Sequence, residues 1–259
     1  MTDQTASDQT TIVLHKPRFP ENIGSAARAM RNMGFSHLVV VAPENPNPER
    51  MRKMATHTAA DVIDRMETFN DLAKALSPFG YVVGTTARTG RQRTEAAPPD
   101  KIAQRIVPIA TNNRIAILFG PEDRGLTNLE LALCHAYVNI PTAEFSSLNL
   151  SQAVMVVCYE LFRAQEKAGK TKAPEPFSRL ATRHELSLMY DEFAMTMAMI
   201  GFENPEKPGY WIDKFRNLFS RLPFGAKEVR MIRGMCRQIS RFSDARYRQG
   251  QKSGGKGTP

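Results

Sequence analysis

The chain has 259 residues, of which 42% are hydrophobic, and a formal net charge of +9. This hydrophobic fraction supports a folded core and excludes a wholly disordered chain. No run approaches the roughly 20 consecutive apolar residues that a membrane-spanning helix needs. The polar first ten residues lack the basic and apolar regions of a signal peptide and are expected to be a disordered tail. We therefore expect one large globular domain, or one domain with an appendage.

Cysteine and histidine spacing gives two further expectations. The three cysteines, Cys134, Cys158 and Cys236, are an odd number, widely spaced and set in apolar surroundings. We expect them to be reduced core residues of a cytoplasmic protein. None of the five histidines is spaced with a second His or Cys as a metal site requires, so no metal is expected.

The positive charge is concentrated in the C-terminal third. Residues 1–164 carry 17 Lys and Arg against 16 Asp and Glu, whereas residues 165–259 carry 18 against 10, a net of +8. This asymmetry favours a polyanionic partner held by an appended region, most simply a nucleic acid. A basic surface that serves only solubility is the alternative.

The first 165 residues alternate between short apolar runs and helix-forming segments. Strands are predicted at 11–17, 37–43, 80–87, 114–120 and 136–141, and helices at 22–35, 48–65, 68–78, 100–106, 126–135 and 149–165. Gly34 is expected to cap the first helix at its C-terminus. Such alternation predicts an α/β fold, a mostly parallel sheet with helices on both faces. Ligands bind such sheets at the carboxyl ends of the strands.

The remainder of the chain is predicted to be helical. A polar Lys/Pro/Gly linker at 166–176 precedes a basic helical extension at 177–247, and the composition of 248–259 predicts a disordered tail. Residues 227–242 form an amphipathic helix with an apolar stripe (Val229, Ile232, Cys236, Ile239) beside a basic one (Arg230, Arg233, Arg237, Arg241). RNA contact by this stripe and by Arg216 is one interpretation, and a solvated outer face is the other.

Three loops carry the chemistry-bearing residues. In the first, residues 17–30, we expect Gly24 to permit a tight turn and Asn22 to cap a helix. Arg28 would then lie about one turn into that helix, close enough to its N-terminus to reach an anion. An ordinary capped helix with a surface arginine would look the same.

The second and third loops lie farther along the chain. In "FGPEDRGLTNLE", Gly125 permits a turn with positive φ, and Thr127 with Glu130 forms a capping box that starts a helix at about Asn128. Glu122 could accept a hydrogen bond from a ligand or hold the loop by bonding backbone N–H groups. In "SSLNLSQA", Ser146, Ser147 or Asn149 could cap the following helix. These polar groups exceed what one cap needs, which favours a polar site.

The three loops together resemble a known family. "NIGSAARAM", "ILFGPEDRGL" and "SSLNLSQAV", in this order, resemble the signature motifs of the SpoU/TrmH family of RNA ribose 2′-O-methyltransferases, in the SPOUT superfamily. The likeness covers residues 11–165. The C-terminal "DKFRNLFSRLPFGAKEVRMIRGMCRQI" resembles the helical extension of the TrmJ branch, which methylates tRNA at nucleotide 32 of the anticodon loop. Dinucleotide-binding folds are disfavoured, because the first βα loop lacks G-x-G-x-x-G.

The resemblance implies a fold, a cofactor and a set of site residues. It implies a deep trefoil knot that builds an S-adenosylmethionine pocket, and two subunits that pair as a homodimer. Matched to the motifs, the cofactor contacts would be Thr85, Thr86, Ala87, Gly120, Ile140, Ser146, Ser147 and Leu148. Arg28 would serve the active site formed with the partner subunit, contact RNA and clamp the phosphate beside the target. Ser147 and Asn149 would orient the ribose, and Glu122 would hold the site in shape.

The expected activity is therefore transfer of a methyl group from S-adenosylmethionine to a tRNA ribose 2′-hydroxyl, without a metal. Two alternatives stay open. One is the same reaction on ribosomal RNA, because the catalytic motifs are shared between substrates. The other is a non-catalytic RNA-binding protein on the same scaffold, against which the intact motif residues argue.

Overall fold

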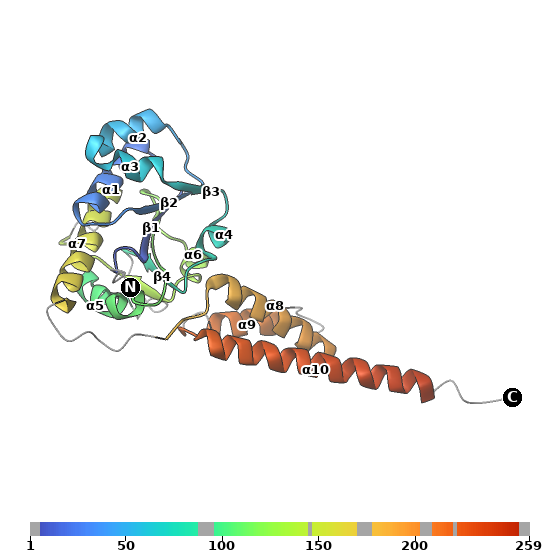
Figure 1. Cartoon of the computed structure of the whole chain (residues 1–259). Coiled ribbons are helices and arrows are strands. Elements are labelled where there is room, and N and C mark those ends of the chain that lie inside the picture. The colour runs from blue at the N-terminus through green and yellow to red at the C-terminus, as the bar shows by residue number, and fades with distance from the viewer. Residues whose placement is uncertain are drawn as a thin grey trace. The chain divides into compact units, whose positions relative to one another are not determined.

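The structure, a computed structural model, describes residues 6–87, 96–144, 147–169, 178–202, 209–219 and 222–253. The chain divides into two compact units, Met1–Arg179 and Leu180–Pro259. Each unit is described by itself below, and Figure 1 shows its elements.

The first unit is built on a seven-stranded sheet in the order β3-β2-β1-β6-β4-β7-β5, and every strand pair in it is parallel. This confirms the mostly parallel α/β fold. The strands are β1 (Thr10–His15), β2 (His37–Val41), β3 (Glu67–Phe69), β4 (Tyr81–Thr85), β5 (Ala96–Ala97), β6 (Ile115–Phe119) and β7 (Ala136–Val138). The threading of the trefoil knot stays a prediction.

Helices cover both faces of this sheet (Figure 1). They are α1 (Pro20–Asn32), α2 (Pro48–Ala55), a 3-10 turn (His57–Ala59), α3 (Ala60–Asp64), α4 (Leu72–Leu76), α5 (Pro99–Ala110), α6 (Asn128–Leu131) and α7 (Leu150–Ala168). On one face, helix α7 packs against both α1 and α5. On the other face, Leu76 of α4 and Leu131 of α6 join a buried cluster with Val13, Val82 and Leu118 of the strands. Successive side chains of a strand point to opposite faces of the sheet, so each central strand contributes side chains to the cores on both faces.

The sequence placed most of these elements correctly, with three corrections. The helix predicted at 48–65 is broken at Thr56, whose φ of 60° lies in the left-handed region. The helix predicted at 68–78 begins later, because Glu67–Phe69 pair with β2 as the edge strand β3. The two-residue strand β5 was missed.

Helix α1 differs most from its prediction. It begins at Pro20 with Phe19 as N-cap, so Asn22 lies inside the helix and does not cap it. Gly24 makes no tight turn: a Cβ there would lie 2.0 Å from the Met51 carbonyl oxygen, so glycine allows α2 to pack against α1. The C-terminus is as expected. Gly34, with φ 81°, donates its N–H to Arg31 O, and Phe35 donates to Met30 O, which is a Schellman motif.

The second unit is helical, as predicted, with α8 (Arg183–Met199), α9 (Tyr210–Phe219) and α10 (Ala226–Ser253). Its core packs Leu186, Met189 and Tyr190 of α8 against Val229 of α10. A single antiparallel bridge joins Leu180 to Gly225. Helix α10 continues past residue 248, where the predicted tail began.

All three cysteines are free and buried, which confirms their expected place in the core. Burial raises the pKa of the Cys158 thiol far above its usual range. Among the described residues, no helix combines the length and apolarity that crossing a bilayer requires.

A partly buried hydrogen bond between two titratable side chains joins α6 to the central strand β1. His15 Nε2, at the end of β1, lies 2.9 Å from Glu130 Oε1. Glu130 is the third residue of α6 and closes the predicted capping box with Thr127. Burial lowers the pKa of His15, and the hydrogen bond to Glu130 opposes this only in part. Burial alone would raise the pKa of Glu130, but hydrogen bonds from Thr127 and His15 hold it below its usual value.

These shifts predict how stability depends on pH. Because the folded chain resists protonation of His15, the unfolded chain binds more protons just below the ordinary histidine pKa of 6.5. The free energy of unfolding should therefore fall as the pH drops through that value, above the range in which Glu130 titrates. Urea unfolding at a series of pH values measures this. His15→Gln should flatten the dependence, and His37→Gln, at an exposed histidine, should not. Equal slopes for the wild type and His15→Gln would contradict the prediction.

Candidate active site

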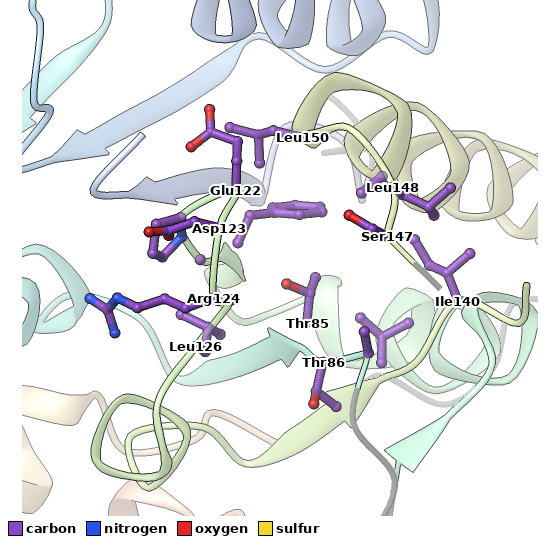
Figure 2. A pocket seen from close by; sticks show the side chains of 17 residues that line it. Thr85, Thr86, Glu122, Asp123, Arg124, Leu126, Ile140, Ser147, Leu148 and Leu150 are labelled. Carbon is purple, nitrogen blue, oxygen red and sulfur yellow. The ribbon is translucent and has the colours of Figure 1, made fainter. Parts of the chain in front are cut away.

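A cavity of about 320 Å³ opens at the carboxyl ends of the central strands. Three segments line it: the end of β4 (Thr85, Thr86, Ala87), the loop after β6 (Gly120 to Leu126), and the connection from β7 to α7 (Ile140, Ser147, Leu148) with the first residue of α7, Leu150. Figure 2 shows the loop after β6 across the cavity from Ser147 and Leu148, with Thr85 and Thr86 between. This volume lies at the lower end of the range for small-molecule sites. The location is the one that parallel sheets use for ligands.

The structure brings the predicted cofactor residues together. All of those that it describes, namely Thr85, Thr86, Ala87, Gly120, Ile140, Ser147 and Leu148, line this one cavity. Ser146 lies outside the described residues. Glu122 also lines the cavity, whereas Arg28 and Asn149 are not among its lining residues. Sequence reasoning did not select Leu126 and Leu150, which are apolar residues within the quoted motifs, or Val138 on β7.

Backbone packing gives the cavity its walls. A Cβ on Gly120 would lie 2.5 Å from Gly125 C and from Leu126 N, so glycine lets the loop fold back onto the end of its own strand. Gly125 reverses the chain with a φ of 65°, as its sequence position predicted. Thr86 is bound to β7 at two points: its N–H donates to Val138 O, and its carbonyl accepts from Asn139 Nδ2 at 2.8 Å. These contacts make the cavity walls rigid.

Glu122 binds the first loop to the second. Its Oε1 accepts a hydrogen bond from Asn22 Nδ2 at 2.7 Å, and its Oε2 accepts from the backbone N–H of Arg18 at 3.0 Å. A carboxylate that receives one backbone and one amide donor is strongly oriented. These hydrogen bonds are those expected of a residue that holds the loops, whereas a contact between Glu122 and a ligand stays a prediction.

Asn149 extends this network to the third loop. Its Nδ2 donates to Asn22 Oδ1 at 3.1 Å, while its Oδ1 accepts from the backbone N–H and the hydroxyl of Ser151. Asn149 is the N-cap of α7, in a capping box with Gln152. Among the described residues, these bonds occupy both lone pairs and one of the two amide hydrogens of Asn149. Asn22 is therefore the residue on which all three loops converge.

Sequence reasoning missed this role of Asn22. Its only local signal was a polar residue near a helix start, which was read as a cap. The partners Glu122 and Asn149 are 100 and 127 positions away, and nothing in the local pattern encodes a contact at that separation.

Arg28 lies elsewhere on α1 than predicted. Because the helix starts at Pro20, Arg28 is roughly two turns from its N-terminus, not one. Its side chain is exposed. The expected distance of one turn is therefore wrong, and contact of Arg28 with an anion stays a prediction.

The arginines expected to bind RNA in the second unit differ in their surroundings. Arg233 forms a bidentate ion pair with Glu192: its Nη2 lies 2.6 Å from Oε1 and its Nε lies 3.1 Å from Oε2. This pair lowers the pKa of the Glu192 carboxyl. Arg216 contacts Asp191 at 3.3 Å. Arg230 and Arg237 are exposed on α10. RNA contact by these residues stays a prediction, and it is easiest for Arg230 and Arg237. The described residues include no group of His, Cys, Asp or Glu placed to hold a metal ion.

The network predicts that Asn22 stabilises the site. Asn22→Ala removes one bond to a carboxylate and one to an amide, which should lower the free energy of unfolding by about 1–3 kcal/mol. Asn22→Asp should cost more, because it sets a second carboxylate against Glu122. Hydrogen exchange of residues 17–22 and 121–126 should quicken in both variants. Asn32→Ala, at an exposed position at the end of α1, is the matched control. Wild-type stability and exchange in Asn22→Ala would refute this role.

Comparison with known protein families assigns both units. The model of the SpoU rRNA Methylase family matches residues 9–159. The model of the tRNA methyltransferase TrmJ, C-terminal domain, matches residues 184–252.

Curated relatives extend over nearly the whole chain. The tRNA (cytidine/uridine/adenosine-2'-O-)-methyltransferase TrmJ of Pseudomonas aeruginosa (strain UCBPP-PA14) is 36% identical over 91% of this chain and 95% of its own length. The tRNA (cytidine/uridine-2'-O-)-methyltransferase TrmJ of Photorhabdus laumondii is 33% identical over 90% of this chain and 97% of its own.

Solved structures agree with this assignment. The crystal structure of TrmJ from Z. mobilis ZM4 has a TM-score of 0.74 at 30% identity, covering 89% of this chain and 99% of that one. A probable methylase family protein from Haemophilus influenzae Rd KW20 has a TM-score of 0.61 at 29% identity, covering 92% and 98%. The chain belongs to the SpoU methylase family and, within it, to the TrmJ tRNA methyltransferases.

Proposed function

We propose that this chain transfers the methyl group of S-adenosylmethionine to the ribose 2′-hydroxyl of nucleotide 32 in the anticodon loop of tRNA. The observation that carries the proposal is the joint match of both units. The first unit matches a methylase family, and the second matches the C-terminal domain of tRNA methyltransferases. The two named relatives are tRNA 2'-O-methyltransferases, and each aligns with about nine tenths of this chain.

The cavity fits S-adenosylmethionine in size and chemistry. The strand-end threonines offer hydroxyl and backbone groups for a nucleoside, and Leu126, Ile140 and Leu148 offer apolar contacts for its flat base. Glu122, Asp123 and Arg124 lie on the same wall, so the lining carries charges of both signs. When bound, the cofactor supplies an electrophilic methyl group on a sulfonium sulfur. No metal ligand is needed for this chemistry.

Positioning would supply most of the rate enhancement. Methyl transfer to a hydroxyl is an in-line displacement, so its rate depends on how closely the acceptor oxygen is aligned with the methyl carbon. The Glu122–Asn22–Asn149 network holds the loops in a fixed arrangement around the cavity. Ser147, which is exposed and lines the cavity, would orient the ribose. Asn149 would assist with its remaining amide hydrogen.

Arg28 would act from a second copy of the chain. It is exposed on α1 and is not among the residues that line the cavity of its own chain. In a homodimer that pairs these units, the guanidinium of one copy could clamp the phosphate next to the target ribose of the other and stabilise charge on the 2′-oxygen. A guanidinium stays protonated, so we assign it this role and not that of a general base. The substrate tRNA and the reduced cysteines favour the cytoplasm.

Ribosomal RNA is the second candidate substrate. The family model that matches residues 9–159 is named for rRNA methylases, and the site residues lie within that range. The second unit favours tRNA, because its match is to a tRNA methyltransferase domain.

Transfer of a labelled methyl group tests the function directly. Purified protein, labelled S-adenosylmethionine and a tRNA transcript should give labelled tRNA, with the label mapping to the ribose of nucleotide 32. A transcript with a 2′-deoxy nucleotide at that position is the matched control and should stay unlabelled. Labelling of ribosomal RNA with none of any tRNA would replace the first candidate by the second.

Two sets of variants test the role of Arg28. Arg28→Lys keeps the charge but loses the planar fork, so kcat should fall at least about ten-fold while S-adenosylmethionine affinity stays unchanged. Arg28→Ala and Gly120→Val should each be inactive, since valine at 120 collides with the Gly125–Leu126 backbone. If Arg28 acts across the dimer, mixing the two variants and letting their subunits exchange into mixed dimers should restore part of the activity. Wild-type kcat in Arg28→Lys would refute the clamp, and no recovery on mixing would refute the action across subunits.

A further inference from the structure

The second unit carries exposed aromatic side chains outside its core. That core is formed by Ala181, Leu186, Met189, Tyr190 and Val229. By contrast, Phe202, Tyr210 and Trp211 are 47%, 40% and 41% exposed. We call these three residues the aromatic platform. Large aromatic side chains left at a surface usually mark a binding surface.

The platform is held in shape by the end of α8. Gly201, with φ 73°, reverses the chain there. The N–H of Gly201 donates to Ala198 O and that of Phe202 to Met197 O, which together form a Schellman motif. Phe202 is thereby brought against Trp211, with ring centroids 5.4 Å apart, and Trp211 meets Tyr210 at 5.3 Å. Both distances are those of favourable aromatic pairs.

The surface of the platform suits flat rings better than enclosed ligands. Its hollow, lined also by Met197 and Ile212, has a volume of only about 20 Å³ and cannot surround a small molecule. Because the Trp211 ring is inclined by 38° to Phe202 and by 76° to Tyr210, a flat ring would stack on one of these side chains at a time. Lys214, one turn after Tyr210 on α9, places its ammonium nitrogen 5.5 Å from the Tyr210 ring centroid. Exposed aromatic faces beside a cation are the combination that binds single-stranded nucleic acid.

We propose that Phe202, Tyr210 and Trp211 form a stacking surface for unpaired bases of the RNA substrate. The excess of positive charge in residues 165–259 supports this occupant, because it attracts a polyanion and disfavours a second copy of the same surface. Lys214 would contact the phosphate next to a stacked base. The inference rests on the proposed function only in that RNA is the substrate, and it adds where the unpaired nucleotides bind.

Trp211 is the only tryptophan in the chain, so its fluorescence reports on the platform alone. An unstructured oligoribonucleotide of about 10 bases should quench the emission in a saturable manner, because stacking brings a base against the indole. Inorganic polyphosphate, which has charge without bases, should not quench it, and an RNA duplex of equal length should quench it weakly. Equal quenching by polyphosphate or by the duplex would overturn the proposal.

Substitutions measure the contribution of the platform to catalysis. Trp211→Leu should raise the KM for tRNA about five- to a hundred-fold and leave kcat at saturating tRNA unchanged. Trp211→Phe, which keeps a ring, should restore most of the affinity. Met235→Ala removes an exposed apolar side chain from α10 and is the control. An unchanged KM in Trp211→Leu, with methylation intact, would overturn the platform while the proposed function stands.

Acrylamide quenching of the full-length chain distinguishes RNA from protein as the occupant of this surface. Acrylamide should quench Trp211 in the RNA-free protein, and bound oligoribonucleotide should protect it. Trp211 shielded from acrylamide without RNA, or a change of oligomeric state in Trp211→Leu, would mean that protein covers the platform and would overturn the proposal. If no RNA is methylated but saturable, base-dependent quenching is seen, the proposed function fails and the platform stands.

Discussion

The hydrogen bonds to the carboxylate of Glu122 are the interactions on which the arrangement of the loops around the cavity depends. This carboxylate receives a backbone N–H from Arg18 and the side-chain amide of Asn22, and Asn22 in turn receives the amide of Asn149. Three segments far apart in sequence are thus joined by hydrogen bonds to one acceptor and one amide. The packing of α7 against α1 and the pairing of β6 with β1 constrain the distance between the loop after β6 and the start of α7, and these hydrogen bonds add to that constraint.

Local sequence rules succeeded where local forces decide the structure. The capping box of Thr127 and Glu130 and the glycine after α1 were predicted because their partners lie within four residues. Asn22 and Gly24 were misread because each acts on a distant segment: one bonds to Glu122 and the other makes room for Met51. The strands β3 and β5 were missed for a related reason: Glu67 and the two alanines of β5 are residue types depleted in strands, so pairing and not composition defines these two strands.

The predicted cofactor residues were chosen by motif likeness, and the structure adds that those it describes line one cavity. The charge of the second unit was equally visible in the sequence, but its distribution was not. Two of the arginines in the expected RNA-binding set are paired with Asp191 and Glu192, so part of the basic excess holds the helices together. The net charge of the sequence predicts the sign of the partner's charge. Only the contacts in the structure show which charged side chains remain accessible to that partner.

Because Asn149 caps α7 and also bonds to Asn22, the first turn of that helix and the wall of the cavity share a residue. Fraying of the helix start and opening of the site are therefore thermodynamically linked. A ligand that binds the assembled cavity must also favour the helical first turn, and its binding free energy adds to the stability of the folded unit. The resistance of this unit to unfolding should then follow the cellular concentration of its cofactor, so that a drop in cofactor supply weakens the fold itself.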